Sequence, residues 1–276
     1  MKPWDSSAKH NSKKLKHPST IGGINRLANE EKRAIYARVL PAELLEKFGI
    51  DPGLVDEQGR ELFLINAPSG SSTAEISLYH QHDFIDPILY GHITDTINGQ
   101  IHILFYILND PCAARYDIDR LPDGRLTQLG SKYRNFEAEV EAMKAGLSPG
   151  QIRQGPHLLR NALETFESFI VSLNHDLHFA EPLFYHNAVI FERYGFAYQQ
   201  GRRLMQRIQN GFGLGGDLLD LLDGSSPFRQ PLAANSIRLR SWAIHDGILG
   251  QPFQNVTMYK HVGQHSGLSS CSGCNW

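Results

Sequence analysis

An Asn-Gly pair at residues 98 to 99 constrains the fold more than any other feature of this sequence. It joins two β-rich runs, "PILYGHITDTI" and "QIHILFYILND". Asn-Gly favours a type I′ hairpin turn because both central residues of that turn need positive φ. A two-residue loop pairs Asp95 with His102 and places His92 opposite Phe105. In that register the side chains of His92 and His102 point to opposite faces of the sheet, so they cannot join one site.

The order of the other elements predicts the fold class. Two further strands, at 61 to 67 and 74 to 81, precede the hairpin, so four consecutive and mostly antiparallel strands are expected. Asn135 is a candidate cap for the helix that follows it, and an apolar stripe at helical spacing in residues 156–173 is expected to face the core; its members are Leu159, Leu163, Phe166, Phe169 and Ile170. Helical patterns cover 29–39, 41–49, 135–146, 156–173, 184–195, 201–212 and 215–224, and strand-like runs cover 177–184, 236–244 and 255–262. This succession predicts a mixed α/β or α+β protein with a mostly antiparallel central sheet flanked by helices.

Composition divides the chain into four regions. Residues 1–22 carry several lysines and few apolar side chains, which predicts a disordered basic arm. A helical extension follows at 23–56, and the main α/β domain spans 57–262, with an insertion at about 110–150 and a C-terminal addition. Residues 263–276 form a tail that contains cysteines. With 276 residues and 41% hydrophobic side chains, the chain is long enough for a substantial core.

Charge and hydropathy exclude several classes of partner. A formal net charge of -2 gives no overall attraction to nucleic acid or to anionic membranes. No run approaches the roughly 20 apolar residues of a membrane span, and the N-terminus has no apolar block typical of a signal peptide. Three cysteines do not make a disulfide framework. We therefore expect a cytoplasmic protein that binds neither nucleic acid nor membrane, while a homodimer is left open.

A helix at residues 184–195 stops abruptly at a glycine. Gly195 is expected to be its left-handed end, since glycine takes positive φ without penalty, and Phe196 then turns into the core. The stretch "NAVIFERYGF" resembles the GNAT superfamily of N-acetyltransferases, in which the helix after the fifth strand commonly carries an Asn/Ala turn, an aromatic-Glu pair and Gly-Phe. The matching residues are Asn187, Ala188, Phe191, Glu192, Gly195 and Phe196. "VTMYKHV" is similar to the last strand of that family, and the resemblance covers roughly residues 60–200.

The resemblance implies an acyl-CoA-dependent acyltransferase. Acetyl-CoA or another acyl-CoA would lie across the splayed fourth and fifth strands, with its pyrophosphate at residues 153–158, before a helix N-terminus. The acceptor would be the amine of a small molecule or a peptide. The residues implied to bind the cofactor are Arg153, Gln154, Gly155, His157 and Asn187. In this loop, however, His157 stands where the family has a small residue, and Pro156 removes a backbone donor.

Three residues are candidates for the catalytic proton transfers. Glu181 and His186 bracket the end of the fifth strand and are candidate bases. The alternatives are that His186 caps or flanks the start of the helix and that Glu181 is a solvated carboxylate at the strand end. Phe191 occupies the position that often carries a proton-donating tyrosine in this family, and it cannot transfer a proton. Tyr194 is the nearby hydroxyl that we consider in its place.

Histidines suggest a metal-dependent enzyme as an alternative function. His80 and His82 share a face of a predicted strand, and zinc or non-haem iron sites use such ligands. A second set comprises His175, His178, Glu181 and His186. The tail has the spacing H-x3-H-x5-C-x2-C, which a structural zinc site uses; its residues are His261, His265, Cys271 and Cys274. A labile disulfide and an unstructured tail are the other interpretations. A third function is that of a non-catalytic binding protein that retains the fold.

Overall fold

A computed structural model describes residues 18–127 and 133–276 of the chain. Within them, seven strands form one open sheet in the order β1-β2-β3-β4-β5-β7-β6. The strands are β1 (Phe63–Asn66), β2 (Thr73–Leu78), β3 (Leu89–Asp95), β4 (Ile101–Leu108), β5 (Leu177–Ala180), β6 (Ala197–Gln200) and β7 (Thr257–His261). Among these described strands, β4 and β5 alone pair in parallel. The predicted mixed class and mostly antiparallel sheet are therefore confirmed.

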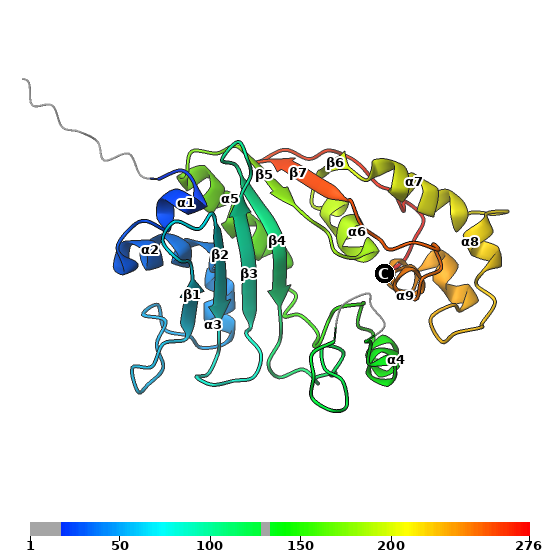
Figure 1. Cartoon of the computed structure of the whole chain (residues 1–276), viewed down its shortest axis with the longest axis horizontal. Coiled ribbons are helices and arrows are strands. Elements are labelled where there is room, and N and C mark those ends of the chain that lie inside the picture. The colour runs from blue at the N-terminus through cyan, green and yellow to red at the C-terminus, as the bar shows by residue number, and fades with distance from the viewer. Residues whose placement is uncertain (1–17, 128–132) are drawn as a thin grey trace, which may run out of the picture.

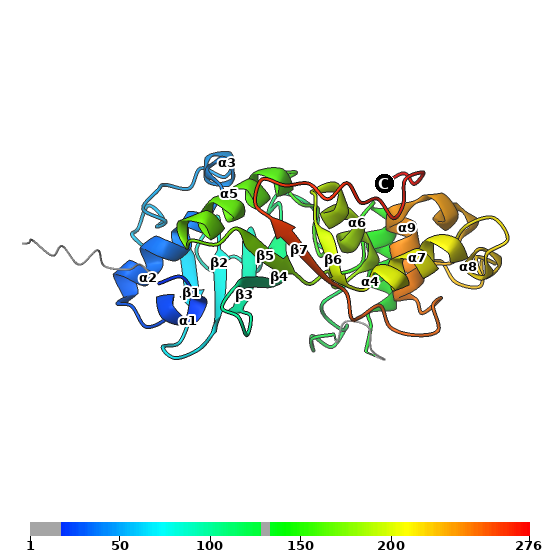
Figure 2. The same cartoon turned by 90° about the horizontal axis from the view of Figure 1, so that it is seen from above.

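Helices flank the sheet along its length (Figure 1). They are α1 (Ile21–Ile24), α2 (Asn29–Tyr36), α3 (Ala42–Lys47), α4 (Phe136–Lys144), α5 (Leu159–Ser172), α6 (Tyr185–Arg193), α7 (Arg202–Gly211), α8 (Asp217–Asp220) and α9 (Ile237–His245), with 3-10 turns η1 (Ala37–Val39) and η2 (Pro231–Asn235). Seen from above, α3 and α5 lie on the same side of the sheet (Figure 2). The apolar stripe predicted for α5 is confirmed, since Leu163, Phe166, Phe169 and Ile170 are buried.

The predicted hairpin is present, but its register near the turn differs by one residue. Asp95 pairs with Ile101, and His102 lies opposite Thr94. The loop is one residue longer than predicted because the amide of Thr96 donates to the carbonyl of Gln100, 2.7 Å away. Three-residue loops of this kind commonly carry a glycine with positive φ at their last position.

Further along the hairpin a bulge removes this offset. The register shifts between His92 and Ile93, so that β4 contributes one extra residue and His92 lies opposite Phe105, as predicted. Because His102 is opposite Thr94, it shares a face with His92. The expectation that these two histidines point to opposite faces is therefore wrong.

The segment at residues 236–244 is a helix, and the strand predicted there is wrong. Ser236 begins α9, and its hydroxyl accepts a hydrogen bond from the amide of Leu239 at 3.2 Å. Such a cap satisfies one of the free N–H groups at a helix start. Trp242 is fully buried, and its indole N–H donates to the carbonyl of Leu147 at 2.8 Å. Tertiary burial thus overrides an alternating pattern that favours a strand.

The N-terminal helices belong to the same core as the sheet. Residues 1–17 of the predicted basic arm lie outside the described residues, whereas Ile21 already belongs to α1 and is fully buried. The carboxylate of Asp95 accepts hydrogen bonds from the amides of Ile21 and Gly22, at 2.7 and 2.8 Å. This fixes α1 at the end of β3, because a carboxylate is favourable at a helix N-terminus.

The insertion after β4 has a small core of its own, shared with α9. Its buried residues are Ile118, Ala142, Leu147, Phe228 and Trp242. The predicted cap of α4 is confirmed, since the side chain of Asn135 accepts from the amide of Ala138 at 3.3 Å. The insertion is therefore anchored on α9, which precedes β7 in the sequence.

Candidate functional site

The parallel strands β4 and β5 separate after a short paired segment. They pair at Ile101 with His178, His102 with Phe179, and Ile103 with Ala180. One further bond joins them, from the amide of Glu181 to the carbonyl of Ile103 at 3.0 Å. Beyond this point β4 continues to Leu108 without β5 beside it. The carboxyl ends of the two strands therefore diverge.

The bulge in β4 lies at the point of divergence. Leu104 is the extra residue, between the pairs that Ile103 and Phe105 make with β3. A β-bulge bends its strand and redirects the following side chains. On the redirected half, the hydroxyl of Tyr106 is enclosed and has no hydrogen-bond partner among the described residues. Burial raises the pKa of Tyr106, so its hydroxyl stays protonated and free to donate a hydrogen bond.

The loop at residues 153–158 is held against the carboxyl end of β4. The amide of Asp110 donates to the carbonyl of Gln154 at 2.9 Å. A Cβ on Gly155 would lie 3.2 Å from the carbonyl oxygen of Leu108, so this glycine permits a close approach of the two backbones. The loop leads directly into α5, whose N-terminus therefore lies beside the divergent strand ends.

The N-terminus of α5 lacks the usual means of satisfying its free amides. Leu158 is the N-cap residue and makes no side-chain cap bond, and the first turn contains no acidic residue. It contains the exposed Arg160 instead. The amino group of Lys47 is close by, 3.2 Å from the carbonyl oxygen of Pro156 and 3.2 Å from the carboxylate of Asp110. Free amides together with basic side chains make this helix start suitable for an anion.

The predicted cofactor-binding residues have different environments. Arg153 is buried, and its Nε lies 2.9 Å from the Asp86 carboxylate, which also binds Arg115. Its guanidinium therefore holds the loop in place. Gln154 and His157 are exposed, and His157 has a φ of 62°. Asn187 lies in the first turn of α6, where its amide donates to the carbonyl of Phe184 at 3.1 Å.

Glu181 and His102 lie together where β4 and β5 separate. Glu181 is exposed, directly after β5. Burial lowers the pKa of His102, and the nearby charge of Glu181 acts in the opposite direction. The Nε2 atom of His102 is enclosed and has no partner in the described part of the chain. A neutral imidazole with a free nitrogen can accept a proton. The sequence relates His102 only to His92, because the pairing of His102 with Phe179, two residues before Glu181, is a long-range contact that no local pattern indicates.

His186 occupies a different environment from Glu181. It is buried in α6, and its Nδ1 lies 2.9 Å from the hydroxyl of Ser241 in α9. Burial, with a smaller effect from His245, lowers the pKa of His186 to about 3. The ring is therefore neutral near pH 7. The start of α6 has no side-chain cap, so of the two alternatives His186 flanks the helix start, where it is buried and hydrogen-bonded to α9.

Tyr194 lies at the far end of α6 from the site. The helix begins at Tyr185, just after Glu181, and Tyr194 caps its C-terminus. A nine-residue helix is about 13 Å long, so α6 separates Tyr194 from the divergent strand ends. The abrupt end of α6 is as predicted, since Gly195 has a φ of 91° and Phe196 is fully buried.

The cysteines of the tail form a disulfide. Cys271 and Cys274 are bonded to each other, so in this state neither can supply a thiolate to zinc. His265 contacts the carbonyl of Arg193 at 3.2 Å, and His261 is exposed at the end of β7. Of the interpretations left open by the sequence, the structure contains the disulfide.

The other histidine sets are dispersed. His80 and His82 lie in the loop after β2, which ends at Leu78, so the prediction that they are on a strand is wrong. His80 packs edge-on against Phe84, and His82 lies 2.9 Å from the carboxylate of Asp83.

The second set is divided between separate environments. His175 contacts the carbonyl of Ser19 at 2.5 Å, whereas His178 and His186 are buried. In the described residues no three His, Cys, Asp or Glu side chains are grouped to hold a metal ion.

Comparison with known proteins finds no matching family model, no matching curated protein and no matching solved structure. None of the helices described is both long and apolar enough to cross a lipid bilayer.

Proposed function

We propose that this protein is an acyl-CoA-dependent acyltransferase that transfers an acetyl or related acyl group to an amine, on a fold that resembles the GNAT superfamily. One observation carries the proposal. The parallel strands β4 and β5 diverge at their carboxyl ends, beside the N-terminus of α5. Ligands of α/β sheets bind outside the carboxyl ends of parallel strands, and phosphate groups bind at helix N-termini.

The geometry supports one orientation of acyl-CoA. Its pyrophosphate would accept hydrogen bonds from the first-turn amides of α5, where the exposed Arg160 supplies positive charge and Lys47 would be shared between Asp110 and the phosphates. The pantetheine arm would extend between β4 and β5. Its amides would form hydrogen bonds with backbone groups in the second half of β4, which has no β5 residues beside it. The buried hydroxyl of Tyr106 would donate a hydrogen bond to this arm. In this orientation Arg153 positions the loop through Asp86 and does not contact the phosphates.

The chemistry requires a base and a leaving group. The acceptor amine loses a proton and attacks the thioester carbon, and the CoA thiolate departs. Glu181, with His102 beside it, is the base that the geometry favours, because both lie where the strands separate. Phe191 packs on Phe196, with ring centroids 4.9 Å apart, and donates no proton. A thiolate whose conjugate thiol has a pKa of about 8.5 can leave near neutral pH without a strong acid.

Calorimetry with acetyl-CoA tests the binding site. Arg160→Glu places a negative charge in the first turn of α5, and we expect it to weaken binding roughly tenfold, or about 1.4 kcal/mol. Arg203→Glu is the matched control, because Arg203 is also exposed in the first turn of a helix, α7. The control variant should bind as the unmodified protein does. Equal weakening in both variants, or no binding of acetyl-CoA at millimolar concentration, would refute this site.

Release of free CoA thiol in the presence of small-molecule and peptide amines tests the reaction. We expect amine-dependent thiol release that falls at least about a hundredfold in Glu181→Gln, while acetyl-CoA binding is retained. Binding that is retained without any amine-dependent release would contradict the transferase function. It would leave a non-catalytic acyl-CoA-binding protein.

A further inference from the structure

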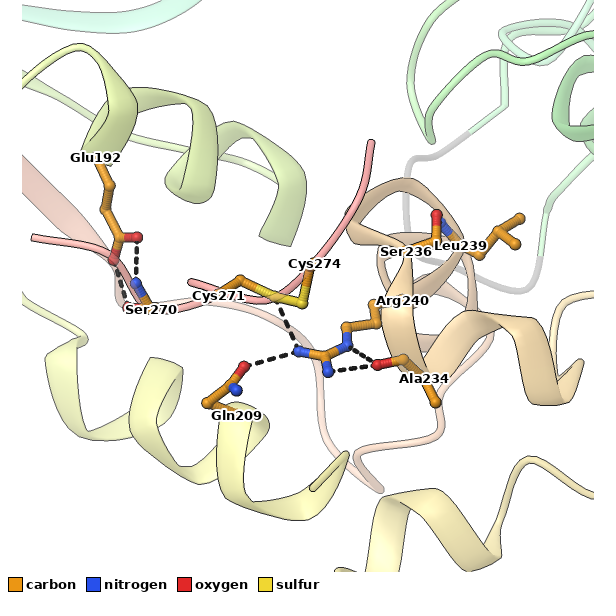
Figure 3. The surroundings of a disulfide bond; sticks show 9 residues. All are labelled: Glu192, Gln209, Ala234, Ser236, Leu239, Arg240, Ser270, Cys271 and Cys274. Atoms are coloured by element: carbon orange, nitrogen blue, oxygen red, sulfur yellow. Dashed lines mark hydrogen bonds between the residues drawn. A yellow bond between two sulfur atoms is a disulfide. The ribbon is translucent and has the colours of Figure 1, made fainter. Parts of the chain in front are cut away.

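The disulfide of the tail lies against α9 and is anchored on both sides. Before it, Ser270 donates hydrogen bonds from its amide, at 2.7 Å, and from its hydroxyl to the buried carboxylate of Glu192. After it, the carbonyl of Asn275 accepts from the amide of Ile237, at 2.8 Å, in the first turn of α9. The pair is therefore held at a defined position on the protein (Figure 3).

An arginine contacts one sulfur of the pair. The Nη1 atom of Arg240 lies 3.0 Å from Sγ of Cys271 and 2.8 Å from the side-chain oxygen of Gln209. The Nε and Nη2 atoms of Arg240 donate to the carbonyl of Ala234, so the group is fixed in front of the disulfide (Figure 3). Arg240 is itself buried, and its guanidinium also lies over the ring of Phe212. A guanidinium held at this distance stabilises a thiolate on Cys271.

The two sulfurs differ in accessibility. Cys271 is 4% exposed, whereas Cys274 is only partly buried. An external thiolate can therefore reach Cys274 more readily. If it attacks there, the departing sulfur is that of Cys271, the one that Arg240 contacts. Thiol-disulfide exchange is faster when the leaving thiol has a low pKa.

A polar cavity of about 200 Å³ adjoins this cluster. Its wall includes Ser270, which precedes Cys271, and Gln209, which binds Arg240. Arg202 and Gln206 line it as well, together with Glu192, whose carboxylate is occupied by Ser270 and Tyr198, so the cavity offers the positive charge of Arg202 and amide groups. These groups suit a small polar thiol that carries carboxylates and amides, such as a short peptide thiol.

The structure assigns a thiol-disulfide exchange site to Cys271 and Cys274, with Arg240 stabilising the departing sulfur and a small polar peptide thiol as the reductant. The thiolate of this reductant attacks Sγ of Cys274, the Cys271–Cys274 bond breaks, and Cys271 leaves as a thiolate beside Arg240. A second molecule of the reductant attacks the sulfur that the first molecule contributed to the mixed disulfide, and Cys274 leaves as a thiolate, which takes up a proton. The products are the oxidised reductant and two cysteine thiols, so two electrons and two protons enter the protein.

Charged and titratable groups surround this site from every neighbouring element. Arg240 comes from α9 and Arg202 from α7, while Glu192 and the buried Tyr185, which interacts with Arg240, come from α6. Tyr198 comes from β6 and binds Glu192 at 2.6 Å. Because the Glu192 carboxylate is held by Ser270 and Tyr198, the guanidinium of Arg240 is the charged group in contact with Cys271. The exchange rate should therefore depend on Arg240 in particular.

The test uses glutathione as the peptide thiol and the full chain with Cys112→Ser, which removes the free cysteine. Reduction is followed by trapping thiols with an alkylating agent and measuring mass. We expect full reduction by millimolar reduced glutathione, and a rate about fivefold lower in Arg240→Gln because the departing thiol becomes less acidic. Arg238→Gln is the matched control, since Arg238 also lies on α9 and binds the carbonyl of Met143 at 2.7 Å. It should leave the rate unchanged.

A second measurement keeps the proposal testable if Arg240→Gln does not fold. In Cys112→Ser, Cys274→Ser, thiolate absorbance reports the titration of Cys271 with Arg240 in place, and we expect its pKa below the usual value of about 8.5. A pKa at or above that value would overturn the assignment. So would a pair that stays oxidised in excess glutathione, or equal rates in Arg240→Gln and Arg238→Gln.

Discussion

His178 provides the sharpest quantitative prediction for the fold. It lies on β5, is fully buried, and packs edge-on between the rings of Phe166 and Phe196, with centroids 5.4 and 5.3 Å away. Both of its ring nitrogens lack a hydrogen-bond partner among the described residues. Burial lowers its pKa to about 4, with the positive charge of Lys260 acting in the same direction and Glu167 opposing it.

The lowered pKa makes stability depend on pH in a definite direction. Between the unfolded pKa of about 6.5 and the folded pKa of about 4, the unfolded chain binds more protons than the folded one. Above about pH 6.5 protonation of His178 therefore does not reduce the free energy of unfolding. As the pH falls below that value, the free energy of unfolding decreases. At about pH 5 the loss is roughly 2 kcal/mol, from 2.303RT multiplied by about 1.5 pH units.

His178→Leu should remove this loss and raise stability at neutral pH. Leucine has a similar volume and brings no polar atom into the core, so we expect a gain of about 1 to 3 kcal/mol at about pH 7.5. The loss between about pH 7.5 and pH 5 should become smaller by roughly 2 kcal/mol. Urea unfolding at both pH values measures these changes. His261→Leu, at an exposed position on β7, is the matched control and should retain the acid sensitivity of the unmodified protein.

Two outcomes would refute the reasoning on His178. One is a His178→Leu variant that loses as much stability on acidification as the unmodified protein. The other is a variant that is destabilised at neutral pH, which would mean that the imidazole has partners that the structure does not contain.

Two further predictions concern the end of α6. Gly195→Ala should destabilise the protein by at least about 1 kcal/mol, because φ is 91° and the new Cβ would lie 3.0 Å from Cα of His265. Urea unfolding measures this change, and an unchanged unfolding midpoint would contradict the left-handed helix end. Glu192→Gln should lower the free energy of unfolding by about 1 to 3 kcal/mol, because an amide provides one acceptor oxygen where the carboxylate provides two. Hydrogen exchange at the amide of Ser270 should become faster, and an unchanged exchange rate would contradict the anchoring of the tail.

Local signals in the sequence predicted most of the fold. The glycine at the end of α6, the Asn135 cap and the apolar stripe of α5 each act within a few residues, and each is confirmed. The error in the hairpin register has a physical cause. The loop is one residue longer than a type I′ turn, and the bulge in β4 adds a compensating residue. A pattern-based reading cannot detect two irregularities that cancel further along the strands.

Long-range contacts account for what the sequence could not predict. The alternation in "SIRLRSWAI" favours a strand, yet α9 forms because Ser236 caps it and Trp242 is buried against Leu147, 95 residues earlier. Arg153 pairs with Asp86 across 67 residues, which no local pattern indicates. The candidate site combines β4, β5 and the start of α5: its loop and Glu181 could be predicted from the sequence, whereas the positions of His102 and Arg160 depend on contacts between these elements.

Helix α9 connects the parts of the molecule that the two proposals concern. Ser241 contacts His186 in α6, which follows the divergent end of β5, and Arg240 contacts the disulfide of the tail. The residues on which the proposals depend are nevertheless separate, because Arg160 and Glu181 belong to α5 and the end of β5, whereas Cys271 and Arg240 belong to the tail and α9. Loss of acetyl-CoA binding in Arg160→Glu with normal glutathione exchange would therefore place the two activities at independent sites.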